Sequence, residues 1–126
     1  MQRITLLCVG KLKERFYAEA AAEYVKRLGR YCKLTVMELP EERLPESPSP
    51  AQVEAALERE AAAIRSRLPA SAGLIALCVE GRMQSSEELA QLMETWAGRG
   101  EKQLVFLIGG SFGLHESVKA EVRVKL

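Results

Sequence analysis

The chain alternates short apolar runs with longer segments of helical periodicity, and this alternation constrains its fold more than any other feature. Four apolar runs have the length and composition of buried strands, and each ends at or beside a glycine or proline. These runs lie at residues 3–10, 32–39, 73–81 and 103–108. A last stretch, 122–126, alternates apolar and polar residues and predicts a fifth strand.

Two capping boxes mark where helices begin between the apolar runs. Ser49 pairs with Gln52, and Ser85 pairs with Glu88, each three residues apart and followed by apolar residues at helical spacing. We predict one helix from Ser49 to about Leu68 and another after Ser85. A proline-rich stretch before the first of these helices, residues 40–50, predicts an irregular surface loop.

A further amphipathic helix is predicted over residues 13–29, where Gly29 has the position of a left-handed C-terminal cap. Residues 116–121 predict a short helix, and Trp96 shares an apolar stripe that predicts a core position. Strands that alternate with helices predict an α/β fold with a mainly parallel sheet and helices on both faces. The length predicts one domain over residues 1–126.

Composition excludes several classes of protein. Charged residues make up 28% of the chain and the longest apolar runs are strand-sized, so we expect no membrane segment and a cytoplasmic protein. Cys8, Cys32 and Cys78 lack zinc-site spacing and predict small buried thiols. His115 is the single histidine, so His–His metal motifs are excluded; we expect no metal, and we interpret His115 as a polar residue near a helix start.

The net charge of +1 hides a basic amino-terminal segment. Residues 1–33 carry eight Lys or Arg against three Glu, whereas residues 38–60 carry seven Glu against two Arg. The basic segment, in particular Lys11, Lys13 and Arg15, could meet phosphate groups of RNA. An ordinary solvated helix surface is the equally open alternative.

The most unusual stretch is "LVFLIGGSFG", in which a buried strand runs into Gly109, Gly110 and Gly113. No Lys follows to make a phosphate-binding loop, and the spacing is not that of a dinucleotide-binding turn. A small ligand held by backbone groups, such as an adenosine moiety, suits this loop; a tight turn without a ligand is the alternative. Ligands of parallel sheets bind at the carboxyl ends of strands, so residues 79–81 and 108–110 are predicted to share one pocket.

Three ordered motifs resemble the ribosomal RNA large subunit methyltransferase H family, and together they span nearly the whole chain. The motifs read "ITLLCVGKLKERFYAEAAAEYVKRLGRY", "LCVEGRMQSSEELA" and "FLIGGSFGL". The resemblance implies a SPOUT-type trefoil-knot fold that binds S-adenosylmethionine and methylates N3 of a pseudouridine in 23S rRNA, as a homodimer. Members of this family continue beyond the position of Leu126 with a strand and a helix that complete the knot. We therefore expect a chain truncated relative to the family, with an incomplete knot.

The resemblance places the cofactor contacts on Leu77 and Gly109. Gly81 and Gly110 flank these positions, and we interpret them as glycines that let the backbone approach the cofactor. No well-placed general base is evident, so the catalytic residues stay unassigned. Glu80 is the only carboxylate at a relevant strand end, with a solvated loop residue as its simpler interpretation.

Two other classes of function stay open at this point. A catalytically silent ribosome- or RNA-binding module would keep the fold and the basic segment without turnover. A flavodoxin-like signalling module is disfavoured, because the first strand ends without the acidic cluster that such receivers use.

Overall fold

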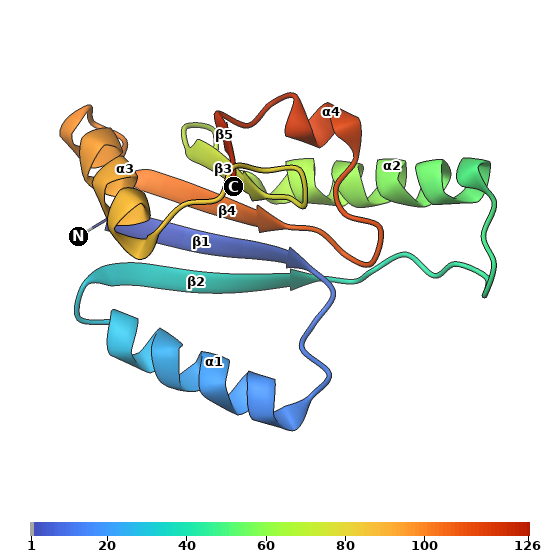
Figure 1. The fold of residues 1–126 in the computed structure, drawn as a ribbon, viewed down its shortest axis with the longest axis horizontal. Helices are drawn as coiled ribbons and strands as arrows, with labels where there is room; N and C mark the ends of the chain where they lie inside the picture. The colour runs from blue at the N-terminus through green and yellow to red at the C-terminus, as the bar shows by residue number, and fades with distance from the viewer. Residues whose placement is uncertain (1) are drawn as a thin grey trace.

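The computed structural model describes residues 2–126 and consists of a five-stranded sheet with four helices (Figure 1). The elements in chain order are β1 (Gln2–Val9), α1 (Arg15–Leu28), β2 (Cys32–Leu39), α2 (Pro50–Arg67), β3 (Gly73–Leu77), α3 (Ser86–Gly98), β4 (Gln103–Ile108), α4 (Glu116–Lys119) and β5 (Val124–Lys125). The strand order is β2-β1-β4-β3-β5, and every pairing is parallel. The predicted parallel α/β architecture is confirmed.

Both faces of the central strand β4 are buried, as its continuous apolar run predicts. Val105 and Leu107 point into one core cluster, which also contains residues of α2 and α4. Leu104 and Phe106 point into the other cluster, where Trp96 of α3 packs. Helices therefore cover both faces, and the predicted core position of Trp96 is confirmed.

The two capping boxes begin helices as predicted. The hydroxyl oxygens of Ser49 and Ser85 each accept a hydrogen bond from the backbone N–H of the residue three positions later. The side-chain oxygens of Gln52 and Glu88 in turn accept hydrogen bonds from the backbone N–H groups of Ser49 and Ser85. Each box satisfies two amide groups that the first helical turn leaves without partners. The helix after Ser49 ends at Arg67, one residue from the expected end.

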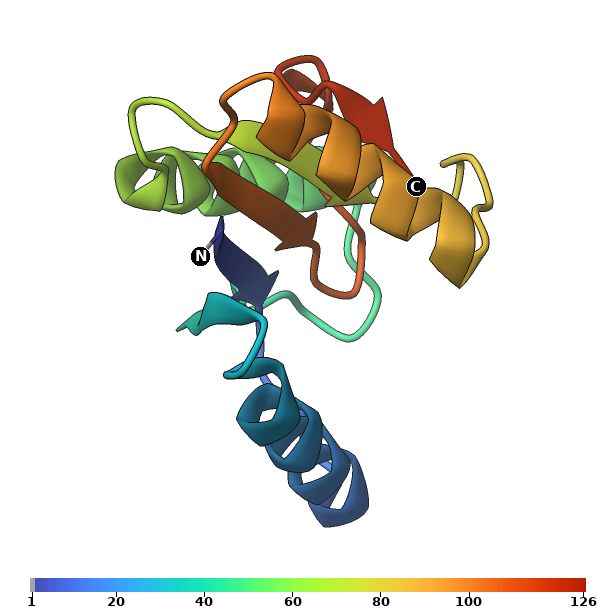
Figure 2. The ribbon, with the colours of Figure 1, turned by 90° about the vertical axis from the view of Figure 1, so that its left-hand side faces the viewer.

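Helix α1 differs from the other long helices because none of its residues is buried. Figure 2 shows α1 projecting away from the rest of the molecule. Phe16, Tyr17 and Tyr24 are each more than half exposed. The predicted amphipathic helix is present, but its apolar side lacks a cover within residues 2–126.

Several predicted details are wrong. The last strand spans only Val124–Lys125 instead of residues 122–126. Gly29 caps α1 in the right-handed helical conformation, with φ −57° and ψ −20°, so this position does not need a left-handed glycine. The third strand ends at Leu77 instead of Gly81, because the amide of Gly81 turns back to the carbonyl of Cys78 at 3.1 Å. Val79 is consequently fully exposed.

None of the helices within residues 2–126 combines the length and the apolar character needed to cross a bilayer.

Candidate functional site

The loops that follow β3 and β4 enclose one cavity at the carboxyl edge of the sheet. Neighbouring parallel strands end at the same edge, and β3 and β4 pair directly up to Leu77 and Ile108. The cavity has a volume of about 430 Å³, and its walls include Leu77, Gly109 and Gly110. This volume lies within the range of roughly 300–1,000 Å³ typical of small-molecule sites. Val79 and Glu80 share this cavity with residues 108–110 as predicted, whereas Gly81 does not line it.

The glycine loop closes on itself in a tight turn. The amide of Gly113 donates to the carbonyl of Gly110 at 3.0 Å, and Gly113 has a φ of +80°, which favours glycine. A side chain on Gly109 would collide with the backbone of Gly113. Gly109 and Gly113 are therefore required by the turn itself, which fixes the backbone that lines the cavity.

Gly81 lies outside the wall of this cavity and packs against the end of β5. A side chain at Gly81 would overlap the backbone of Leu126. The amide of Cys78 donates a hydrogen bond to the carbonyl of Leu126 at 2.7 Å, and the amide of Arg82 donates one to the carbonyl of Lys125 at 3.0 Å. Gly81 thus allows two backbone segments to meet, a physical reason different from the ligand approach inferred from sequence.

The space beside Gly110 is also filled by another part of the chain. A Cβ atom built on Gly110 would lie 2.5 Å from the carboxylate oxygen Oε2 of Glu41. Glu41 belongs to the proline-rich loop between β2 and α2 (residues 40–49, hereafter the strap). The absent side chain at 110 therefore makes room for Glu41, while the backbone of Gly110 still lines the cavity.

An ion pair closes one side of the cavity. Lys119 Nζ lies 2.7 Å from Glu80 Oε1 and 3.6 Å from Glu116 Oε1. The hydrogen bond from Lys119 lowers the pKa of Glu80, and the same bond raises the pKa of Lys119. A carboxylate with a lowered pKa is a weaker base, so the geometry does not favour Glu80 as a general base.

The thiol of Cys78 also lines the cavity but is not activated. Burial raises the pKa of this thiol, and the nearby carboxylate of Glu80 raises it further. The positive charges of Lys119 and Lys125 lower the pKa and offset part of this rise. Cys78 is therefore a thiol rather than a thiolate near neutral pH. All three cysteines are free, but only Cys32 is buried, so the prediction of buried thiols is wrong for Cys8 and Cys78.

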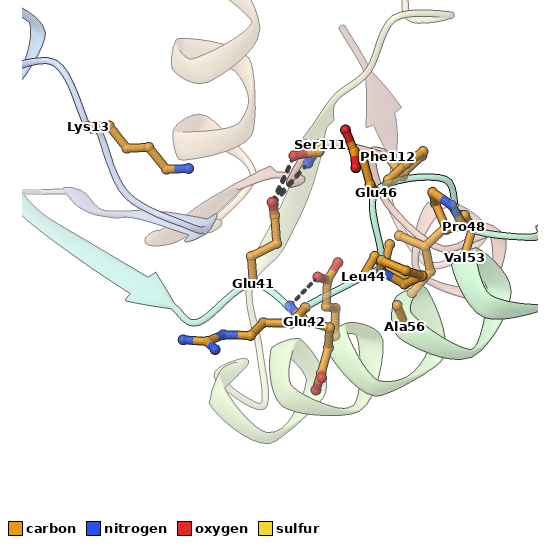
Figure 3. A pocket seen from close by; sticks show the side chains of 14 residues that line it. Lys13, Glu41, Glu42, Leu44, Glu46, Pro48, Val53, Ala56, Ser111 and Phe112 are labelled. Carbon is orange, nitrogen blue, oxygen red and sulfur yellow. Dashed lines mark hydrogen bonds between the residues drawn. The ribbon is translucent and has the colours of Figure 1, made fainter.

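Two of the three singled-out basic residues lie at the same edge as the cavity. Lys11 and Lys13 stand on the loop between β1 and α1. Figure 3 shows Lys13 pointing toward Glu41 and Ser111, with which it lines a neighbouring cavity of about 400 Å³. Arg15 instead lies on α1, where it is exposed and paired with Glu19 at 2.9 Å.

His115 caps the start of α4, which confirms its interpretation as a residue at a helix start. Its Nδ1 accepts the amide of Ser117 at 3.1 Å, and its Nε2 lies 2.5 Å from Glu54 Oε1. The ligand atoms of Glu54, Glu58 and His115 lie within 4.8 Å of one another. Both ring nitrogens are already engaged by the chain itself.

Sequence reasoning missed the link between the strap and the glycine loop. Glu41 accepts hydrogen bonds from the amide and the hydroxyl of Ser111, 70 residues later in the chain. The prolines identified the strap as a surface loop, but nothing in the sequence pairs an ordinary Glu with an ordinary Ser so far away.

Comparison with known proteins identifies the class. The family model described as "Predicted SPOUT methyltransferase" matches residues 2–126. The chain is 44% identical over 115 residues to the ribosomal RNA large subunit methyltransferase H of Listeria monocytogenes serotype 4a (strain HCC23). It is 43% identical to the proteins of the same name from the serotype 4b strains CLIP80459 and F2365. Each match covers 91% of this chain and 72% of the relative.

The chain therefore belongs to the SPOUT methyltransferase family, within the group of the ribosomal RNA large subunit methyltransferases H. The family resemblance drawn from the three sequence motifs is confirmed.

Proposed function

We propose that this protein transfers a methyl group from S-adenosylmethionine to N3 of a pseudouridine in 23S rRNA, with the cofactor in the cavity between the β3 and β4 loops. The observation that carries the proposal is the meeting of Leu77 and Gly109 in one cavity of about 430 Å³ in a chain of this family. Apolar strand ends and a backbone-lined turn suit a flat adenine ring.

S-adenosylmethionine supplies the methyl group as an electrophilic sulfonium when it is bound. The work left to the chain is positioning: the turn at 109–113 fixes backbone groups toward the cofactor, and the nucleotide must present N3 in line with the methyl carbon. The N3 proton must leave during transfer, and the paired Glu80 is poorly suited to accept it. The base of the reaction therefore stays unassigned.

The RNA side of the site is proposed to lie on the loop between β1 and α1. Lys11 and Lys13 stand at the same edge of the sheet as the cavity and can meet phosphates, which supply most of the salt-dependent affinity for RNA. Replacing Lys11, Lys13 and Arg15 by Glu is expected to weaken binding to 50S particles and to flatten its salt dependence. The matched control replaces Lys26, Arg27 and Arg30 by Glu, the same charge change at the opposite end of α1.

Methyl transfer to ribosomes from cells that lack the modification tests the proposal directly. Labelled S-adenosylmethionine should deliver label to 23S rRNA, and mapping should place it on N3 of pseudouridine. Binding to 50S particles with no transfer of label would favour the second candidate, a silent ribosome-binding module. Because such a module would also keep the basic loop, only the transfer assay separates the two.

A homodimer joined through α1 is part of this proposal. A groove of about 390 Å³ separates α1 from the sheet, and its walls include Tyr24, Leu28 and Val36. The aromatic residues of α1 are exposed, and apolar surface of this kind marks interaction sites. Tyr24→Glu should reduce the mass measured by light scattering, whereas Met83→Glu, which alters an exposed residue away from the groove, should not.

The proposed substrate sets the location. Ribosomes are cytoplasmic, so we propose that the protein acts in the cytoplasm, with residues 1–126 forming one methyltransferase domain.

A further inference from the structure

The carboxylate of Glu41 holds the glycine loop from outside the cofactor cavity. It accepts the amide of Ser111 at 3.1 Å and the hydroxyl of Ser111 at 2.8 Å (Figure 3). A carboxylate that accepts two bonds from one residue fixes both its backbone and its side chain. Ser111 directly follows the two glycines whose backbone lines the cavity.

Glu41 also fills the space that a side chain on Gly110 would need. The nearest atoms to a Cβ at that position are Glu41 Oε2 at 2.5 Å and Cδ at 2.8 Å. Glu41 itself is absent from the cavity wall, which Gly110 and Ser111 do line. The side chain thus lies against the glycine loop on the side that faces away from the proposed cofactor.

The strap that carries Glu41 is anchored to α2 through the next residue. The amide of Glu42 donates to Glu60 Oε2 at 2.9 Å, and the Glu42 carboxylate lies 3.4 Å from Nε of Arg59. Glu60 is the one buried charged residue within residues 2–126, with 7% of its surface exposed. This anchor places Glu41 before any ligand binds, so the loop receives a fixed support rather than a flexible surface side chain.

We propose that Glu41 is a positioning residue of the cofactor site, which holds the turn at 109–113 in its binding geometry through Ser111. This inference rests on the proposed function, because the geometry it preserves is that of the cofactor cavity. Glu41 does not line the cofactor cavity, so its effect on cofactor binding passes through the loop.

The first test compares three substitutions by calorimetric titration with S-adenosylmethionine. Glu41→Ala removes both hydrogen bonds and should raise the dissociation constant about tenfold. Glu41→Gln keeps one acceptor oxygen and the side-chain volume, and should recover most of that loss. Glu46→Ala, which removes an exposed carboxylate of the same strap, should bind as the wild type does. Equal midpoints in urea for Glu41→Ala and Glu46→Ala would exclude general destabilisation as the cause.

The second test asks why residue 110 is a glycine. Gly110→Ala should weaken binding strongly, because its methyl group meets Glu41. Adding Glu41→Ala to Gly110→Ala should restore binding to the level of Glu41→Ala alone. If the double variant binds as poorly as Gly110→Ala, then the ligand rather than Glu41 requires glycine there, and the proposal is wrong.

A ligand-independent measurement separates this inference from the proposed function. Amide hydrogen exchange of Ser111 should speed up in Glu41→Ala and stay slow in Glu46→Ala. A wild-type protein that binds no S-adenosylmethionine would overturn the proposed function, while fast exchange in Glu41→Ala would still establish that Glu41 holds the loop. Unchanged Ser111 exchange in Glu41→Ala, together with unchanged affinity, would overturn the role of Glu41.

Discussion

The loops after β3 and β4 line the same cavity, yet the chain holds them in different ways. The loop at 78–82 is held mainly by backbone hydrogen bonds to Lys125 and Leu126, beside the ion pair of Glu80 with Lys119. The loop at 109–113 is held by its own glycine turn and by the side chain of Glu41. Backbone contacts tolerate most substitutions, whereas a side-chain support can be removed by a single one. The two loops should therefore respond to mutation in distinguishable ways.

The largest effect is expected from Gly109→Val. The added side chain collides with the backbone of Gly113, so the turn cannot keep its shape and S-adenosylmethionine binding should fall below detection in calorimetry. Gly98→Val is the control, because a side chain there meets open space. Undiminished affinity in Gly109→Val would mean that the turn has no part in binding.

Gly81→Ala should act on stability more than on the β4 loop. The methyl group overlaps the backbone of Leu126, and we expect a loss of about 1–3 kcal/mol in the free energy of unfolding as β5 shifts. Hydrogen exchange should speed up at Cys78 and Arg82, whose amides bond to the β5 segment, and not at Ser111. Faster exchange at Ser111 as well would show that the two loops are held as one unit.

Glu60→Gln tests the anchor of the strap. Burial raises the pKa of Glu60. The hydrogen bond from the Glu42 amide and the positive charge of Arg59 lower this pKa, whereas the negative charges of Glu41 and Glu42 raise it further. A pKa that is higher in the folded state than in the unfolded state means that the native state binds the proton more tightly. The protein therefore loses stability as the pH rises from the unfolded-state pKa to the folded-state pKa of Glu60. Glu60→Gln keeps an acceptor for the Glu42 amide without the buried charge.

The variant should therefore resist urea better than the wild type at pH 7, and this advantage should shrink toward about pH 4, where the wild-type carboxyl is protonated. A stability difference that does not change with pH would show that folding does not shift the pKa of Glu60.

The smallest effect is expected from Glu80→Gln on the pH dependence of methyl transfer. Lys119 holds the pKa of Glu80 below its ordinary value, so this carboxylate does not titrate near neutral pH. The pH–rate profile of the variant should keep the shape of the wild-type profile. Loss of one limb of the profile would identify Glu80 as a catalytic acid or base.

The sequence was sufficient to predict most of the framework, because its signals are local. The strands at 32–39 and 103–108 have the predicted bounds, and Ser49 and Ser85 begin helices through contacts three residues apart. The early end of β3 was missed because the apolar Cys78 and Val79 continue the strand pattern into a turn.

The site was predicted in outline only, because its supports are long-range. The sequence indicated a pocket at Leu77 and Gly109, and the parallel register of β3 and β4 brings these strand ends together. What fills the space beside each glycine depends on the tertiary fold: Leu126 lies against Gly81, and Glu41 lies against Gly110. No local pattern encodes these contacts.

The most direct test of the cofactor site is an NMR titration of the wild-type protein with S-adenosylhomocysteine, the product that remains after methyl transfer. The account predicts that the largest amide shift changes fall on Leu77, Gly109, Gly110 and their neighbours in the two loops. Changes confined to the cavity beneath the strap, around Leu44 and Leu57, or to the groove beside α1, would contradict it.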